Sequence, residues 1–348
     1  MAALRAGVVG LGTMGRHHAR VLRELPGVDL VGGVDPSPAA RCATRGLTVG
    51  AELDQLLALG LDMCVVAAPT LAHTDIGLRL ADAGVHTLIE KPLAPDAESG
   101  HLLAKAFEER GLIGCVGHIE RYNSALSAMR LRLGHGELGA VFQVATRRQG
   151  PFPKRIRDVG VVMDLATHDI DLTRWVTGSP YHRVSAFAAR PSGRRCEDLV
   201  VVTGLLADGT ITSHLVNWLS PLKERVFAVT GERGCLVVDT VATELWFHRS
   251  GAVTSDGPAD RPFRGASEGD LIRYAVAKRE ALCAELENFR EAVMGRPADI
   301  VTMRQGVEAV EVADAILTAA RDGAAIETAV GGEPVVAFGL GCAPGAGP

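Results

Sequence analysis

The sequence predicts an α/β protein with two domains: a doubly wound parallel sheet, then an α+β domain built on a mostly antiparallel open sheet. The chain has 348 residues, enough for two domains of ordinary size. Its first third alternates short apolar runs with stretches of helical period, whereas strand-like runs follow one another after about residue 120. We therefore place the first domain at 1–120, the second at 121–330 and a flexible tail rich in Gly, Ala and Pro at 331–348.

Five short apolar runs predict the strands of the first domain. Runs that are apolar throughout suit strands of a parallel sheet covered on both faces. The stretches between them repeat apolar residues at helical spacing. The predicted strands are 6–10, 30–34, 63–68, 86–89 and 113–117, and the predicted helices are 15–25, 37–45, 53–58, 74–83 and 96–110.

The second domain is predicted to contain several consecutive strands with hairpin connections. Asp208-Gly209 and Arg233-Gly234 are turn signals of the kind that join antiparallel strands. The predicted strands are 140–148, 182–188, 199–206, 210–217, 224–230, 235–239 and 243–248. The predicted helices are 124–133, 160–176, 269–294 and 302–321.

Charge and cysteine content exclude several classes of function. The 36 basic and 41 acidic residues give a net charge of −5, so no positive excess draws the chain to nucleic acid or to an anionic membrane. Seven cysteines without a CxxC pair argue against a zinc ribbon and a dense disulfide framework. No apolar stretch reaches the length of a spanning helix. We expect a soluble cytoplasmic protein that needs no metal.

A glycine fingerprint follows the first apolar run. Gly10, Gly12 and Gly15 form GxGxxG around Thr13 and Met14, at a strand-to-helix turn. In such a turn the first glycine allows the tight bend, the second lets the backbone approach a pyrophosphate, and the third lets the helix pack on the strand. The alternative is a glycine turn in another kind of αβ domain.

Asp35 lies 20 residues after Gly15, at the end of the second predicted strand. A carboxylate there accepts hydrogen bonds from the adenine ribose, and its charge repels a 2′-phosphate. The sequence therefore favours NAD over NADP as cofactor. Two alternatives remain: Asp35 is only a turn residue before Pro36, or nearby Arg41 accommodates a phosphate, so that NADP is also possible.

Three later motifs carry a resemblance to a known family. They are Ala67-Ala68-Pro69-Thr70 with His73, then Glu90-Lys91-Pro92-Leu93, then Asp164-xxx-His168. With the glycine fingerprint, they resemble the glucose–fructose oxidoreductase/inositol dehydrogenase (Gfo/Idh/MocA) family over residues 6 to about 323. Within it, 117–123 and 150–158 look like the branch that acts on nucleotide-linked sugars, and similar sequences occur among sugar oxidoreductases of aminoglycoside antibiotic pathways.

The resemblance implies a Rossmann domain followed by a domain with an open sheet, through which family members form dimers or tetramers. It implies NAD(P) chemistry on a sugar, inositol or related polyol, with Lys91, Asp164 and His168 at the reacting carbon. We expect the cofactor to contact the following residues: Gly10, Gly12, Thr13, Met14, Gly15, Asp35, Ala68, Pro69, His73, Glu90 and Lys91.

Hydride transfer requires that the protein take the hydroxyl proton and stabilise the oxygen. We favour His168 as acid/base and Lys91, one of only five lysines, as its electrostatic partner, although these roles could be exchanged. Pro92 predicts a fixed turn, with either a cis or a trans bond, that aims Lys91. Asp164 lies four residues before His168 and shares a helix face with it. The alternatives are a surface Lys91 and an Asp164–His168 pair that only caps a buried helix.

Further residues are expected at the substrate. The expected contacts are Lys91, His118, Tyr122, Arg155, Asp164 and His168, with core packing as an alternative for Tyr122 and for His118. Asp171 is equally a substrate contact or a structural residue. A dense positive patch formed by Arg147, Arg148, Lys154, Arg155 and Arg157 would suit a diphosphate or carboxylate if it lines the cleft.

The leading functional hypothesis is an NAD(P)-dependent sugar dehydrogenase or ketoreductase that interconverts a secondary hydroxyl and a ketone. The substrate is either a nucleotide-linked sugar or an aminoglycoside or cyclitol. One alternative is an NAD-assisted glycosidase, which oxidises the sugar only transiently. The other is a non-catalytic NAD-binding sensor.

Overall fold

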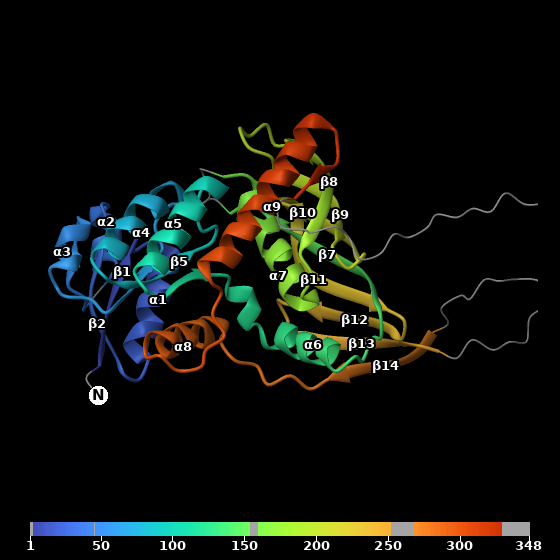
Figure 1. Ribbon diagram of the computed structural model, residues 1–348, viewed down its shortest axis with the longest axis horizontal. Helices are drawn as coiled ribbons and strands as arrows, with labels where there is room; N and C mark the ends of the chain where they lie inside the picture. The colour runs from blue at the N-terminus through green and yellow to red at the C-terminus, as the bar shows by residue number, and fades with distance from the viewer. Residues whose placement is uncertain (1–2, 45, 154–158, 252–267, 329–348) are drawn as a thin grey trace, which may run out of the picture.

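The computed structural model describes residues 3–44, 46–153, 159–251 and 268–328. Its first sheet, which lies in the blue N-terminal part of Figure 1, is parallel throughout and has the order β3-β2-β1-β4-β5-β6. The strands are β1 (Leu4–Val9), β2 (Val28–Val34), β3 (Val49–Gly50), β4 (Met63–Val66), β5 (His86–Glu90) and β6 (Gly114–Gly117). The predicted doubly wound domain is confirmed, and only the two-residue β3 was not predicted.

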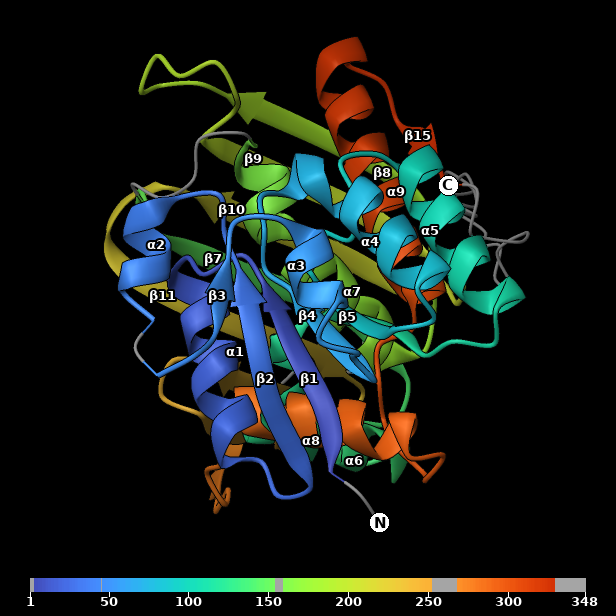
Figure 2. The same ribbon diagram turned by 90° about the vertical axis from the view of Figure 1, so that its left-hand side faces the viewer.

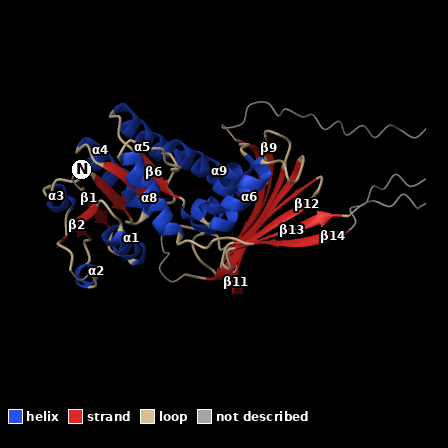
Figure 3. Ribbon diagram, turned by 90° about the horizontal axis from the view of Figure 1, so that it is seen from below, coloured by secondary structure: helices blue, strands red, loops and turns tan. Residues whose placement is uncertain are grey.

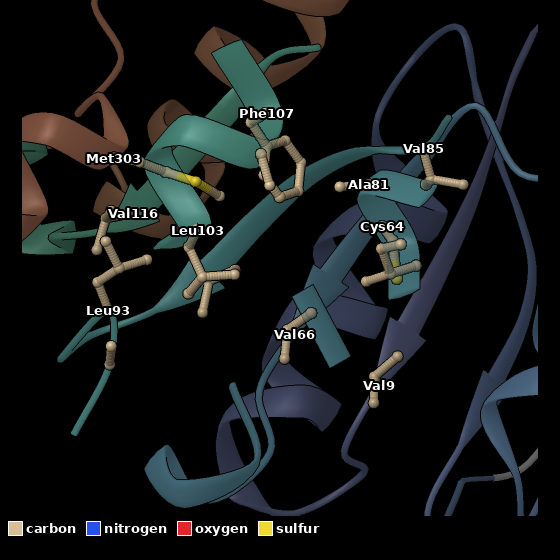
Figure 4. Packing of buried hydrophobic residues seen from close by; sticks show 14 of the residues in the cluster. Val9, Cys64, Val66, Ala81, Val85, Leu93, Leu103, Phe107, Val116 and Met303 are labelled. Atoms are coloured by element: carbon tan, nitrogen blue, oxygen red, sulfur yellow. The ribbon is translucent and has the colours of Figure 1, made fainter. Parts of the chain in front are cut away.

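Apolar clusters cover both faces of this sheet, because successive residues of a strand point to opposite faces. Val9, Val66 and Ile89 point to one face, where they pack with α3 (Leu53–Leu57), α4 (His73–Asp82) and α5 (Ala97–Glu109) (Figure 4). Val8 and Val65 point to the other face, where they meet α1 (Thr13–Glu24) and α8 (Ala281–Val293). The short α2 (Pro38–Cys42) follows β2. Helix α8 therefore covers the first sheet although it comes from the C-terminal part of the chain (Figure 2).

The second sheet has the order β14-β13-β12-β11-β7-β10-β9-β8-β15. Among the strands that the structure describes here, only β7 and β10 pair in parallel, so the sheet is mostly antiparallel, as predicted. Its strands are β7 (Val141–Pro151), β8 (Tyr181–Ala189), β9 (Leu199–Leu206), β10 (Ile211–Asn217), β11 (Leu219–Gly231), β12 (Gly234–Asp239), β13 (Glu244–Ser250), β14 (Glu268–Tyr274) and β15 (Ile326–Glu327).

Helices cover one face of the second sheet and leave the other open (Figure 3). The covering elements are α6 (Ser124–Gly134), the π-helical turn η3 (Val162–Ala166), α7 (Thr167–Thr177) and α9 (Met303–Asp322). Helix α9 also joins the domains, because Met303 and Val307 pack into the first core whereas Ala313 and Ile316 pack into the second.

One predicted element is wrong. The segment predicted as a helix over 269–294 begins as the strand β14, which pairs with β13, and the helix α8 begins only at Ala281. Most residues of β14 are exposed at the edge of the sheet, so its conformation depends on pairing with β13 rather than on a local pattern of burial. The predicted tail at 331–348 lies outside the described residues. In the part that the structure describes, no helix is long and apolar enough to cross a membrane.

Candidate active site

A cavity of about 880 Å³ lies at the carboxyl ends of the parallel strands and reaches the second domain. Ligands of doubly wound sheets bind at this edge. Asp35 and Pro36 line one end of the cavity, and Lys91, Asp164 and His168 line the other. Other predicted cofactor contacts in its wall are Gly10, Gly12, Thr13, Met14, Ala68, Pro69, His73 and Glu90. One continuous space therefore joins the glycine turn to the Lys–Asp–His set.

The three glycines differ in what surrounds them. Gly10 has φ +86°, and a Cβ atom there would lie 2.5 Å from the main-chain oxygen of Ala67. A Cβ on Gly15 would lie 1.8 Å from the oxygen of Gly10, so Gly15 allows α1 to pack close to β1. Gly15 does not line the cavity. By contrast, Gly12 has open space where its Cβ would be, on the cavity side. That space is where a ligand can approach the backbone.

The N-terminus of α1 suits a phosphate group. Gly12 is the N-cap residue, and no side chain caps the helix there. The first-turn N–H groups at Thr13 and Met14 therefore lack a side-chain acceptor, and both residues line the cavity. A helix N-terminus with free N–H groups favours a negative charge. The described residues fit a dinucleotide pyrophosphate at this position.

Asp35 follows β2, and the backbone holds its carboxylate at the cavity. Leu11 N–H donates to Oδ2 and Ser37 N–H donates to Oδ1, both over 2.8 Å. Each oxygen keeps a further acceptor site that can receive a ribose hydroxyl. The Arg41 guanidinium donates to the main-chain oxygens of Asp35 and Pro36, at 2.7 and 3.0 Å. Asp35 is thus both a turn residue and a charged group in the cavity wall.

Lys91 comes directly after β5, and its side chain crosses to the second domain. Its Nζ donates to the main-chain oxygen of Asp164 over 2.5 Å and to Oδ1 of Asp164 over 3.0 Å. The peptide bond between Lys91 and Pro92 is cis. An ammonium group has three donors. Two of them are used here, so one is available for an oxygen atom in the cavity.

His73 connects the Lys91–Pro92 turn with the loop that contains Ala68. Its Nδ1 lies 3.0 Å from the oxygen of Pro92, and its Nε2 lies 2.9 Å from the oxygen of Ala68. Burial lowers the pKa of His73, although the hydrogen bonds to carbonyl oxygens oppose this. A neutral ring donates through only one nitrogen at a time. His73 lines the cavity, but both of its ring nitrogens face main-chain oxygens of the cofactor loop and the lysine turn.

Asp164 and His168 come from the turn η3 and the first turn of α7. The sequence predicted a continuous helix over this segment, but η3 is a π-helical turn, a feature often found at functional sites. His168 is buried, and its Nδ1 has no hydrogen-bond partner in the described structure. Burial and the positive charges of Lys91 and Arg148 lower the pKa of His168 well below its ordinary value. The ring is therefore neutral near pH 7 and able to accept a proton.

Arg148 lies behind His168 as part of a buried ion-pair network. Its Nε donates to Oδ1 of Asp169 over 3.0 Å, and its Nη1 donates to Oε1 of Glu120 over 2.9 Å. Arg147 points to the other side of the sheet and pairs with Glu224. Neither arginine lines the described cavity, so these two members of the patch do not meet the condition under which it would suit a diphosphate or carboxylate. Its other members, including the predicted substrate contact Arg155, lie outside the described residues.

Two predicted substrate contacts do not line the cavity. The hydroxyl of Tyr122 donates to the main-chain oxygen of Asp299 over 2.9 Å, because η2 (Ile119–Tyr122) turns this side chain toward the segment before α9. His118 is buried behind His168, with the two rings edge to face and their centroids 6.4 Å apart. The structure therefore places His118 beside His168 and Tyr122 beside Asp299, and it places neither side chain in the described wall of the cavity.

Asp171 has a structural role. The guanidinium of Arg121 donates to both of its oxygens, at 2.8 and 2.5 Å, and both side chains are buried. Sequence reasoning missed the apolar wall of the cavity, which includes Ile119, Val159 and Leu165. It also missed His18, which is fully buried against Glu90. No motif distinguishes such residues from ordinary core residues.

Together, the parallel sheet, the open glycine turn, the carboxylate at its far end and the Lys–Asp–His set define a dinucleotide-dependent oxidoreductase. Comparison with known proteins agrees with this class. Residues 4–118 match the model of the oxidoreductase family with an NAD-binding Rossmann fold, and residues 126–237 match the GFO/IDH/MocA C-terminal domain. The chain belongs to the GFO/IDH/MocA oxidoreductase family, and its cofactor is NAD.

The relatives include enzymes with different substrates. The chain is 31% identical to a UDP-N-acetylglucosamine 3-dehydrogenase of Acidithiobacillus ferrooxidans, over 84% of this chain and 90% of that protein. It is 33% identical to the myo-inositol dehydrogenase Hyg17 of Streptomyces leeuwenhoekii, over 84% and 89%. The structure of GenD2 from gentamicin A biosynthesis, in complex with NAD, superimposes with a TM-score of 0.77 at 27% identity, over 94% and 97%.

Proposed function

We propose that the chain oxidises a secondary ring hydroxyl of a carbohydrate or cyclitol to a ketone, reversibly, with Lys91, Asp164 and His168 at the reacting carbon. One observation carries this proposal: the Lys91 ammonium, paired with the Asp164 carboxylate, and the His168 ring line the same cavity as the glycine turn and Asp35. When bound, NAD supplies the hydride acceptor.

His168 takes the hydroxyl proton in this mechanism. Its ring is held neutral by burial and by the charges of Lys91 and Arg148, so it has a lone pair available near pH 7. A positioned base of this kind typically contributes about 10²–10⁴-fold to the rate. In the reverse direction, the protonated ring returns its proton to the ketone oxygen.

Lys91 stabilises the oxygen as it loses its proton. Its two hydrogen bonds to Asp164 fix the ammonium group and leave its third donor for the substrate oxygen. The site is largely closed to solvent, which strengthens the interaction of the ammonium with a developing negative charge. The alcohol becomes a ketone when its oxygen has given a proton to His168 and its carbon has given up a hydride, for which a bound NAD would supply the acceptor.

A substrate panel tests the proposal. UDP-N-acetylglucosamine, myo-inositol, scyllo-inositol and an aminoglycoside are each incubated with the protein and NAD, and reduced nicotinamide is followed by its absorbance at 340 nm. We expect at least one substrate to reduce NAD stoichiometrically. Release of an aglycone without a net absorbance change would instead support the NAD-assisted glycosidase. NAD binding without turnover of any substrate would support the sensor.

We also propose that two copies of the chain pair through the open face of the second sheet. This face exposes large apolar side chains at Phe142, Phe187, Val201 and Ile211, and Phe187 is 82% exposed. Exposed apolar patches on a sheet face mark interaction surfaces. We expect Phe187→Glu to lower the mass measured by light scattering, whereas Leu102→Glu, on α5, leaves it unchanged. An unchanged mass in Phe187→Glu would contradict this pairing.

A further inference from the structure

A buried histidine lies on the helix that begins at the glycine turn. His18 is in the second turn of α1 and is fully buried. Its Nε2 lies 2.8 Å from Oε1 of Glu90, the residue that precedes Lys91. The nearby carboxylate can only accept, so Nε2 carries the hydrogen and donates it. Nδ1 of His18 is enclosed and has no hydrogen-bond partner among the residues that the structure describes.

Glu90 connects His18 to the backbone of Lys91. Its second oxygen, Oε2, accepts the main-chain N–H of Lys91 over 3.3 Å. The Glu90 side chain is only 12% exposed, so its negative charge acts on the Lys91 ammonium with little screening by solvent. One hydrogen-bonded chain thus runs from the cofactor-binding helix, through His18 and Glu90, to the backbone of the lysine turn.

We propose that His18 is a positioning residue for Lys91: it holds Glu90 in place, and Glu90 orients the turn that presents Lys91 to the substrate. The inference rests on the proposed function of Lys91. It adds that the distance between the pyrophosphate-binding turn and the reacting ammonium depends on one buried hydrogen bond. His18 does not line the cavity, so its effect reaches the substrate only through Glu90 and Lys91.

The pKa of Glu90 depends partly on His18, so the loss of His18 can be detected as a change in the pH profile. Burial alone would raise the pKa of Glu90, but the hydrogen bond from His18, the charge of Lys91 and the nearby His73 hold it below its ordinary value. Without His18, the pKa of Glu90 rises and the carboxylate becomes protonated at a higher pH. The titratable groups that interact with Glu90 are His18 from α1, His73 from α4, Glu285 from α8, His118 after β6, and Lys91.

The test compares His18→Leu with His18→Gln, which keeps a donor for Glu90, and with His17→Leu, whose exposed side chain is the adjacent residue of α1. Using the substrate that the wild type turns over fastest, we expect His18→Leu to lower kcat by about 10–100-fold. The acid limb of its pH profile should move to higher pH. His18→Gln should recover most of the loss, and His17→Leu should match the wild type.

A spectroscopic measurement tests the same inference without turnover. The five lysines are labelled biosynthetically with ¹³C at Cε, which leaves their ammonium groups unmodified, and the Lys91 signal is assigned with Lys91→Arg. We expect the Lys91 signal to shift in His18→Leu and not in His17→Leu. An unchanged Lys91 signal and an unchanged pH profile in folded His18→Leu would overturn the inference, even if kcat fell. If no substrate of the panel reduces NAD with the wild type, the proposed function fails, and the ¹³C signal still decides whether His18 positions Lys91.

Discussion

The ammonium of Lys91 lies 2.5 Å from the main-chain oxygen of Asp164 and 3.0 Å from its Oδ1, so the end of β5 in the first domain is joined to the π-helical turn of the second. This contact brings together the two elements that the proposed chemistry needs. The side of the cavity that carries the glycine turn belongs to one domain, and the His168 side belongs to the other. Changes in the relative position of the domains will therefore act directly on Lys91.

The choice of cofactor depends on Asp35. Asp35→Ser removes the charge that repels a 2′-phosphate and weakens the hydrogen bonds to the ribose. Because a hydrogen bond to a charged group contributes about 1.5–3 kcal/mol, we expect the NAD-to-NADP preference to fall by roughly 10–100-fold. Fluorescence titration with NADH and NADPH measures both affinities. Asp29→Ser, at the exposed start of β2, serves as control. An unchanged preference in Asp35→Ser would show that Asp35 is not at the ribose.

The pH dependence of alcohol oxidation reports the protonation of His168. Its pKa in the folded protein lies well below 6.5, so the ring stays neutral and able to accept a proton as the pH falls from 8 to 6.5. We expect kcat/KM for the alcohol, measured at saturating NAD, to decline only below pH 6.5, where the ring becomes protonated. An acid limb centred at or above pH 6.5 that disappears in His168→Gln would contradict this protonation state.

Glu285 lowers the stability of the folded chain above acidic pH. Its carboxyl group is buried under the first sheet, neither oxygen has a hydrogen-bond partner in the described part of the chain, and burial together with the charge of Glu90 raises its pKa well above 4.5. The unfolded chain ionises this group above pH 4.5, whereas the folded chain keeps it protonated to higher pH. The cost to folding is therefore absent in acid and grows as the pH rises.

Glu285→Met should consequently stabilise the protein, by about 1–3 kcal/mol at pH 8 and by less at pH 5. Urea unfolding at the two pH values measures the difference. Glu287→Met, on the same helix, should change the free energy of unfolding by less than about 0.5 kcal/mol. A loss of stability in Glu285→Met, or a gain that does not depend on pH, would show that the carboxyl group has a compensating partner.

Much of the fold could be predicted because its elements carry local signals. The apolar runs of β1, β4 and β5 and the turn at Gly10 are readable from neighbouring residues alone. The strand β14 could not be predicted, because its exposed residues are held by pairing with β13 rather than by their own pattern. The position of α8 on the first sheet likewise depends on contacts between distant parts of the chain.

The site likewise combines residues that local motifs reveal with residues whose positions depend on contacts between distant parts of the chain. Lys91, Asp164 and His168 belong to short motifs, and the structure places them at one end of the cavity. Tyr122 and His118 belong to a motif as well, but the direction of their side chains depends on η2 and on the packing around Asp299. His18 has no motif of its own that points to Glu90. The residues that support Lys91 therefore become visible only once the two segments are placed side by side.

Lys91→Met provides the most direct test of the account. The substitution keeps most of the apolar length of the side chain and removes its charged end, and the fluorescence of bound NADH measures cofactor affinity independently of turnover. With the best substrate of the panel, we expect kcat to fall by about 10²–10⁴-fold while the Kd for NADH changes little. Wild-type turnover in folded Lys91→Met would contradict the central claim that Lys91 stabilises the reacting oxygen.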